Sequence, residues 1–173
     1  MIKGEGAMYV TRHQAMRAVD GEAVSRELKD RVEIVDALYR FGLGQDLRDR
    51  DLFASAFSAD AELDFRPAAA KLGVDSELMA GRETIVETIL GVLAQVETTH
   101  VVTNPRVQLD GEVARLTAIV EAQHLLATDH SRYALLKNLY AVELVRDGER
   151  WVIRRLDIDN VWYTGEPKAI FGG

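Results

Sequence analysis

Residues 113–126 read VARLTAIVEAQHLL, a run in which apolar or small side chains occupy every second position. This alternation is typical of a β-strand with one buried face. His124 shares its face with Ala114, Leu116, Ala118, Val120, Ala122 and Leu126, and the other face carries Arg115, Thr117, Glu121 and Gln123. We therefore expect His124 to point into a curved sheet, where the small alanines beside it leave room for a ligand.

Three more long strands are expected around this one. Residues 98–109 precede it, and residues 132–145 and 151–163 follow it. The dipeptides Asp110-Gly111 and Asp147-Gly148 favour tight hairpin turns, whereas residues 127–131 predict a looser connection. Apolar and polar side chains alternate less cleanly in residues 151–163, so the sequence does not determine which face of that strand is buried.

Helical spacing dominates the N-terminal half of the chain. Apolar residues recur at this spacing over residues 22–43, with Gly42 and Gly44 expected to loosen the end of the helix. Asp49 is a plausible N-cap for a second, shorter helix that carries Leu52, Phe53 and Phe57. The other expected segments are a short strand at 61–65 ended by Pro67, a loop or irregular helix at 67–80, and a third helix at 82–95 with Ile85, Ile89, Val92 and Leu93 inward.

Helices followed by a meander of strands predict an α+β protein, with a strongly curved antiparallel sheet packed on about three helices. The chain has 173 residues, a length that gives one ordinary domain with a real core. It shows no internal repeat or linker. We expect a flexible leader at residues 1–20, which includes His13, and a single domain at 21–173.

Composition excludes several classes of function. A formal charge of −7 argues against a nucleic-acid partner, because phosphate binding needs clustered Lys and Arg. The absence of cysteine rules out disulfides and thiolate nucleophiles, and it fits a cytoplasmic protein. No apolar run is long enough for a membrane span. The histidines lack the spacing of metal motifs, so neither a metal nor another cofactor is expected.

His100 is the main candidate for chemistry. It lies near the start of the expected strand 98–109, directly after a helical stretch. An imidazole without perturbing neighbours titrates near pH 6.5, so at neutral pH it can accept and return a proton. Asp46 would hold one ring nitrogen and stabilise the imidazolium. The alternative is a hydrogen-bonded strand histidine and an unrelated aspartate at a helix end, and spacing by itself favours this plainer interpretation.

Further polar and aromatic residues are candidates for the same site. Either His124 or His130 would assist a leaving group, although His130 lies in a polar turn, where a solvated role is the usual one. Asn138 and Tyr140 place polar groups on an otherwise apolar strand face, as pocket hydrogen-bonders or as satisfied core residues. The aromatic side chains that could wall an apolar pocket, with ordinary core packing as the alternative, are Phe65, Trp162 and Phe171.

These motifs and the order of elements resemble the SnoaL-like branch of the nuclear transport factor 2-like superfamily. The nearest likeness is to scytalone dehydratase and lindane dehydrochlorinase, and it covers residues 27–162. Leu43-Gly44-Gln45-Asp46 matches the segment with the catalytic aspartate, and residues 97–104, ETTHVVTN, match the segment with the catalytic histidine. The resemblance implies a cone-shaped, cystatin-like fold with a pocket at its open end. It also implies cofactor-free elimination by a His–Asp dyad, in a homodimer or homotrimer.

The chain departs from scytalone dehydratase at several positions. Gln45 and Phe65 stand where that enzyme has two tyrosines that polarise its substrate, so we do not expect a shared substrate. His130-Ser131-Arg132-Tyr133 resembles the motif of its second histidine, while strand geometry allows His124 in that place. Asn138 resembles its pocket asparagine with an offset of one residue, which a β-bulge would absorb.

Together these features predict a cofactor-independent lyase, dehydratase-like or dehydrohalogenase-like, or an isomerase. Its partner would be a small, apolar, cyclic molecule, bound near Gln45, Phe65, Asn138, Tyr140 and Trp162. An alternative is a non-catalytic ligand-binding or subunit-assembly protein of the same fold, such as an oxygenase small subunit. Such a role needs a pocket or an exposed sheet face but no dyad, and a side-chain-filled interior would favour assembly. A third possibility is isomerase or cyclase chemistry with Asp46 itself as the base.

Overall fold

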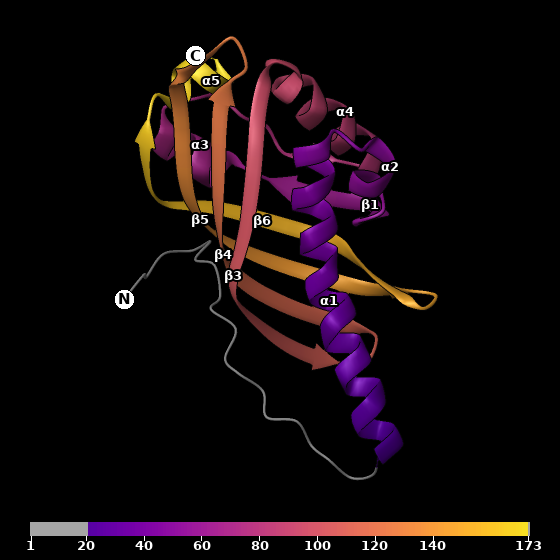
Figure 1. Ribbon diagram of the computed structural model, residues 1–173. Helices are drawn as coiled ribbons and strands as arrows, with labels where there is room; N and C mark the ends of the chain where they lie inside the picture. Colours follow the sequence, from indigo (N-terminus) through magenta and orange to yellow (C-terminus); the bar gives the residue numbers. More distant parts are fainter. Residues whose placement is uncertain (1–20, 173) are drawn as a thin grey trace.

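The computed structural model describes residues 21–172, so the expected leader and His13 lie outside the described residues. Helix α1 (Gly21–Leu47) runs along the concave side of the sheet (Figure 1). The expected loosening at Gly42 and Gly44 is wrong, because the helix continues through both. A Cβ on Gly42 would lie 2.9 Å from the Cβ of His100, and one on Gly44 would lie 2.5 Å from the backbone nitrogen of Phe53. These glycines allow close approach of neighbouring elements instead of ending the helix.

Helix α2 (Arg50–Ala54) begins as predicted, since the Asp49 side chain accepts a hydrogen bond of 2.9 Å from the backbone N–H of Leu52. Phe57, expected on this helix, instead begins strand β1 (Phe57–Asp64). The following segments are α3 (Arg66–Leu72), β2 (Met79–Ala80), α4 (Arg82–Val92) and the 3₁₀ turn η1 (Leu93–Gln95).

Pro67 lies in the first turn of α3, where a proline loses no backbone hydrogen bond. Of the residues expected on the inward face of the third helix, Ile85 and Leu93 are buried and Ile89 is partly buried against the core, while Val92 is 48% exposed in the wall of the open cavity described below. A short C-terminal helix, α5 (Pro167–Phe171), was not predicted. It follows β6 and packs against β5 and β4.

Six strands form one sheet in the order β2-β1-β6-β5-β4-β3. The four long strands are β3 (Val96–Asp110), β4 (Val113–Leu126), β5 (Asp129–Asp147) and β6 (Arg150–Gly165). They form an antiparallel meander, as predicted, whereas β1 pairs with β6 in parallel. The expectation of a wholly antiparallel sheet is therefore wrong at one edge. Four strands separate β1 from β6 along the chain, so no hairpin sets their relative direction.

The turns of the meander follow the glycine signals. Gly111 and Gly148 have φ values of 59° and 62°, as the predicted turns require. The connection after β4 is tighter than expected, because Leu126 already pairs with Asp129 across a two-residue turn. In β6 the register shifts twice relative to β5, once between Lys137 and Asn138 and once between Glu143 and Leu144. These shifts explain why the alternation of side chains in β6 did not determine which of its faces is buried.

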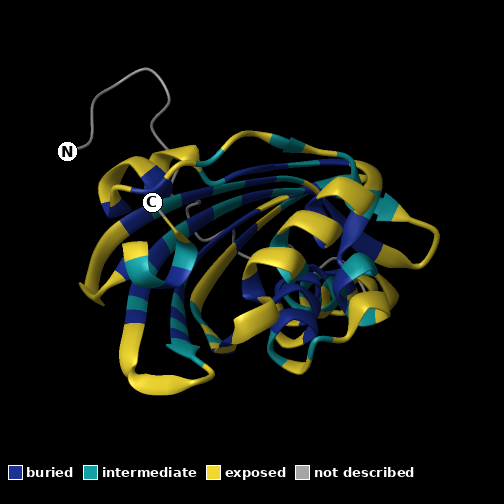
Figure 2. Cartoon of the chain, turned by 90° about the horizontal axis from the view of Figure 1, so that it is seen from above, coloured by how far each residue is buried: buried dark blue, intermediate teal, exposed yellow. Residues whose placement is uncertain are grey.

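The core fills the space between the concave face of the sheet and the helices (Figure 2). The predicted inward face of β4 is buried from Ala114 to His124. Thr117 is also buried, although it belongs to the opposite face. The architecture is the predicted α+β cone: a bent sheet around α1, with α2 and α4 at one side and α3 and α5 at the other (Figure 1).

Candidate functional site

An open cavity of about 500 Å³ lies between the concave sheet and the helices. This size falls within the range of small-molecule sites. Its wall combines apolar side chains with a few polar groups. Members that bear on the chemistry are Phe41, Gln45, Phe65, Thr84, Thr88, His100, His124, Asn138, Tyr140 and Phe171, together with the loop residues Val74, Asp75, Ser76, Glu77 and Leu78.

His100 and Asp46 meet at the wall of this cavity. The Nδ1 atom of His100 lies 2.7 Å from Oδ1 of Asp46, and the His100 backbone N–H donates to Oδ2 at 2.8 Å. The imidazole is only 3% exposed, yet it lines the cavity. With Nδ1 directed to the carboxylate, Nε2 is the ring nitrogen left for a bound molecule. The sequence placed these residues 54 positions apart, and the end of α1 and the start of β3 bring them together.

Other contacts fix the Asp46 carboxylate as an anion. The Thr98 hydroxyl donates to Oδ1 of Asp46 at 2.9 Å and accepts from the Arg48 guanidinium at 3.2 Å. Burial raises the pKa of Asp46, but the hydrogen bonds from His100 and Thr98 outweigh burial and hold this pKa below its usual value. Arg48 also donates to the backbone carbonyls of Gln45 and Val96, which ties the end of α1 to the start of β3.

Of the two candidate second histidines, His124 lines the cavity and His130 does not. The His124 ring lies 5.9 Å from the His100 ring and 4.9 Å from the Phe171 ring, centroid to centroid. Its Nδ1 atom is buried without a hydrogen-bond partner. Burial, and then the nearby His100, lower the pKa of His124 to about 3, so the ring is neutral at physiological pH. His130 lies at the surface and contacts Glu97 at 3.0 Å.

Four of the five predicted pocket residues lie in the cavity wall: Gln45, Phe65, Asn138 and Tyr140. Trp162 is a correction, because it is 48% exposed, does not line the cavity and has the Lys137 ammonium 6.0 Å from its ring centroid. The register of β6 against β5 shifts between Asn160 and Trp162, so the alternation that buries Asn160 does not continue to Trp162.

Sequence reasoning missed several wall residues. Thr84 and Thr88 lie one helical turn apart on α4, a spacing that signals a shared face. Residues 74–78 connect α3 to β2, and no sequence signal distinguished them from an ordinary loop. Asn160, which does not itself line the cavity, was also missed, because the sequence did not determine which face of its strand is buried. It donates to Asn138 Oδ1 at 2.9 Å from the neighbouring strand.

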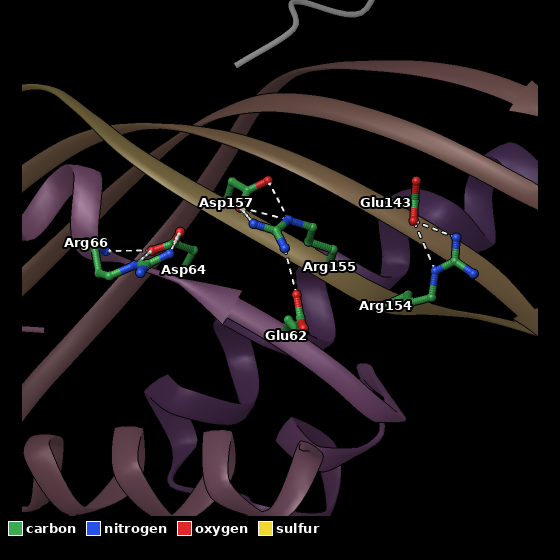
Figure 3. Close-up of polar contacts among 7 residues, drawn as sticks. All are labelled: Glu62, Asp64, Arg66, Glu143, Arg154, Arg155 and Asp157. Atoms are coloured by element: carbon green, nitrogen blue, oxygen red, sulfur yellow. Dashed lines mark hydrogen bonds and ion pairs between the residues drawn. The ribbon is translucent and has the colours of Figure 1, made fainter. Parts of the chain in front are cut away.

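The charged side chains around β1 and β6 pair with one another outside the cavity wall (Figure 3). Arg155 contacts Glu62 at 2.6 Å and Asp157 at 2.9 Å, and Arg66 contacts Asp64 at 2.8 Å. Within residues 21–172, no three acidic or histidine side chains converge as ligands for a metal ion. No helix in this range has both the length and the apolar character of a membrane span.

Solved structures share this architecture. A scytalone dehydratase-like protein from Novosphingobium aromaticivorans superposes with a TM-score of 0.71 at 18% identity, covering 82% of this chain and 91% of its own. Hexachlorocyclohexane dehydrochlorinase LinA-type3 from Novosphingobium barchaimii gives a TM-score of 0.69 at 19% identity, with coverages of 82% and 93%. A protein with a cystatin-like fold from Nostoc punctiforme gives a TM-score of 0.61 at 16% identity, covering 76% of this chain and 90% of its own. At these identities the likeness establishes the fold.

Sequence comparison establishes the family. The chain is 32% identical over 152 residues to the terrestric acid biosynthesis cluster protein E of Penicillium crustosum, covering 84% of this chain and 91% of that protein. The model of the SnoaL-like domain matches residues 26–157, which include most of α1, most of the cavity wall and most of the sheet. The chain therefore belongs to the SnoaL-like domain family.

Proposed function

We propose that this protein is a cofactor-independent lyase or isomerase that removes a proton from a carbon atom of a small, apolar, cyclic molecule. The observation that carries the proposal is the 2.7 Å contact between His100 and Asp46 at the wall of an open cavity. The names of two structural neighbours, a dehydratase-like protein and a dehydrochlorinase, both denote elimination and support this reaction class.

In this proposal the Nε2 atom of His100 takes the proton from carbon. Asp46 fixes the tautomer, because its oxygens accept from both the ring and the backbone of His100. It also stabilises the imidazolium that forms. In a dehydration, the electron pair of the broken C–H bond forms the new double bond, and hydroxide leaves the adjacent carbon. The His100 imidazolium returns its proton to that hydroxide, and neutral His124 offers a hydrogen bond to the departing oxygen.

Two alternatives fit the geometry less well. Asp46 is a poor candidate for the base, because it does not line the cavity and both its oxygens already accept hydrogen bonds. A pure assembly role leads us to expect an interior filled by side chains. The open cavity of about 500 Å³ instead favours a bound small molecule.

The proposal is tested by hydrogen–deuterium exchange at C1 of 2-tetralone, a neutral bicyclic ketone, followed by NMR in D₂O. Exchange requires only proton removal and return, so it does not depend on the natural leaving group. The wild-type protein is expected to accelerate exchange, and His100→Ala to lower the protein-catalysed rate by about 10²- to 10⁴-fold. His130→Ala, which removes a surface imidazole, is the matched control and should keep the wild-type rate.

Lack of acceleration by the wild-type protein, or an undiminished rate in His100→Ala, contradicts the proposal. The lyase and isomerase branches are then separated with 3-hydroxy-1-tetralone, which becomes 1-naphthol by loss of one water. Formation of 1-naphthol supports a lyase, whereas exchange without elimination supports an isomerase.

A further inference from the structure

Arg48 stands at a backbone position that favours glycine. It follows the last residue of α1 with a φ of 57°, in the left-handed region, where a Cβ atom is crowded. Its backbone N–H donates to the carbonyl of Gln45 at 3.2 Å, and that of Asp49 donates to the carbonyl of Gly44 at 2.9 Å. These are the two hydrogen bonds of a Schellman helix ending, whose left-handed residue is usually glycine. Because arginine carries a steric cost here, its side chain is the place to look for a role.

The Arg48 side chain makes contacts that a glycine cannot make. Its guanidinium donates to the backbone carbonyl of Gln45, in the last turn of α1, and to that of Val96, the first residue of β3. It also donates to the hydroxyl oxygen of Thr98 at 3.2 Å. All three acceptors are uncharged, and no carboxylate within residues 21–172 forms an ion pair with Arg48. The planar guanidinium therefore joins the helix end to the strand at three points, a geometry that a lysine could not reproduce.

The contact with Thr98 fixes the direction of its hydroxyl proton. A guanidinium only donates, so the Thr98 oxygen must accept from Arg48. The proton of the same hydroxyl is directed to Oδ1 of Asp46, 2.9 Å away. A hydroxyl that accepts from a cation is also a stronger donor, because hydrogen bonds in a chain polarise one another. Oδ1 is the oxygen that lies 2.7 Å from Nδ1 of His100, so the chain of hydrogen bonds that begins at Arg48 ends on the imidazole.

This chain runs beside a second open cavity, of about 490 Å³. Asp46, Arg48 and Thr98 all line the second cavity, and none of them lines the cavity that His100 faces. The Asp46 side chain is 14% exposed, whereas Thr98 is buried. Solvent that enters the second cavity can compete for the oxygens of the carboxylate. Holding the Thr98 hydroxyl on Asp46 keeps the carboxylate aligned with His100 in the presence of that competition.

We propose that Arg48 is a positioning residue for the His100–Asp46 pair, acting from outside the main cavity through the hydroxyl of Thr98. Because Arg48 does not line the main cavity, its effect reaches the reacting proton by way of Thr98 and Asp46. The kinetic consequence of this inference rests on the proposed proton abstraction. Its consequence for the ionisation of Asp46 can be measured in the free protein, without any turnover.

The test uses Arg48→Gly, which removes the guanidinium and gives the left-handed position the residue that adopts it most readily. The rate of 2-tetralone exchange should fall several-fold, because Asp46 is held less firmly. The dissociation constant of 2-tetralone, measured by ligand-observed NMR, should stay within about twofold of the wild-type value. The pKa of Asp46, from a carbon-13 NMR titration, should rise toward its ordinary value. A general loosening of the fold would weaken binding together with the rate.

Asn104→Gly is the matched control. Between residues 21 and 172, Asn104 is the other residue besides the glycines with a left-handed φ, 53°, and it is exposed on β3 where the register against β4 shifts. It lines neither cavity. The exchange rate and the Asp46 titration of Asn104→Gly should match those of the wild type. Losses as large as those of Arg48→Gly would assign the effect to backbone freedom and overturn the proposal.

The double variant Arg48→Gly, Thr98→Val tests the route of the effect. It should exchange 2-tetralone no more than about twofold more slowly than Thr98→Val alone, because residues that act in one chain do not contribute additively. Losses that multiply would show that Arg48 acts independently of Thr98. Such a result, a wild-type exchange rate in Arg48→Gly, or an unchanged Asp46 titration in that variant contradicts the proposal.

The two proposals can fail separately. If the wild-type protein does not exchange 2-tetralone, proton abstraction is the proposal that fails. The carboxyl titrations of Arg48→Gly and Asn104→Gly then still decide whether Arg48 holds Asp46. A raised pKa of Asp46 in Arg48→Gly alone would support the positioning role, and titrations equal to that of the wild type in both variants would remove it.

Discussion

Asp46 uses both of its carboxylate oxygens on a single residue, His100: Oδ1 lies 2.7 Å from Nδ1 of the ring, and Oδ2 lies 2.8 Å from the backbone nitrogen. The side chain and the main chain of His100 are thus held by one rigid group at the end of a 27-residue helix. Such a two-point contact fixes the direction of the ring as well as its tautomer, which a single hydrogen bond would leave partly free.

Asp46→Asn should lower the rate of 2-tetralone exchange by about 10²-fold or more. An asparagine has one acceptor where the structure uses two, so its NH₂ group would face either the ring or the backbone N–H. An NH₂ group that faces the ring leaves Nδ1 without an acceptor, and the tautomer with hydrogen on Nε2 could not take a proton from carbon. An NH₂ group that faces the backbone would oppose the N–H of His100 and remove the second contact that holds the ring in place. Asp51→Asn, at an exposed carboxylate on α2, is the control. A rate within about threefold of the wild type in Asp46→Asn would contradict the orienting role.

Gly42→Ala should lower the rate of 2-tetralone exchange by a larger factor than the loss of folding stability alone would produce. The new Cβ would lie 2.9 Å from the Cβ of His100, so the helix or the histidine must move. Gly91→Ala is a matched control inside α4, where a Cβ would meet no atom within 4 Å. It should stabilise the protein by about 0.5–1 kcal/mol through helix propensity. Urea unfolding and exchange rates on both variants check this, and unchanged exchange in Gly42→Ala would show that His100 tolerates displacement.

The long strands could be predicted from the sequence because periodicity and Asp-Gly turns specify them locally. The segment 113–126 coincides with β4, and its alternation placed His124 inward. Helical periodicity identified α1 but not its buried face. Leu28 and Val32 have helical spacing, yet they are 48% and 68% exposed. A side chain is buried only where another element covers it, and that depends on the whole fold.

The candidate site was predicted in part, for a related reason. Asp46 and His100 carry motif signals on their own segments, so their proximity could be expected. Asn160 carries no such signal, because a register shift against β5 decides which face it occupies. The direction of β1 beside β6 is likewise set by tertiary packing between strands far apart in the chain. Long-range pairing and bulges are the features that a local pattern does not encode.

Thr98→Val should raise the pKa of Asp46 toward its ordinary value, because the variant loses one of the hydrogen bonds that lower it. A carbon-13 NMR titration of the Asp46 carboxyl group measures the shift directly. The exchange rate at neutral pH should fall only several-fold, since Asp46 stays ionised and keeps both contacts with His100. Thr99→Val, at an exposed position of the same strand, should change neither quantity. An unaltered titration in Thr98→Val would mean that this hydroxyl does not contribute to the ionisation of Asp46.

The buried His124 should make stability depend on pH. Its pKa is about 3 in the folded protein and near 6.5 in the unfolded chain, so between these values the unfolded state binds a proton that the folded state does not. Stability is therefore highest, for this group, above pH 6.5 and falls as the pH is lowered toward 3. At pH 5 the loss is about 2 kcal/mol, from 1.36 kcal/mol for each pH unit below 6.5. Urea unfolding at pH 7.5 and pH 5 measures it.

His124→Gln keeps a polar side chain of similar length without an ionisable group, so its stability should fall by about 2 kcal/mol less than that of the wild type over this interval. Comparing the change between the two pH values, and not the absolute stability, separates titration from any packing cost of the substitution. His130→Gln removes a surface imidazole and should keep the pH dependence of the wild type. If His124→Gln loses as much stability as the wild type between pH 7.5 and pH 5, then His124 is not the buried neutral histidine that the cavity geometry requires.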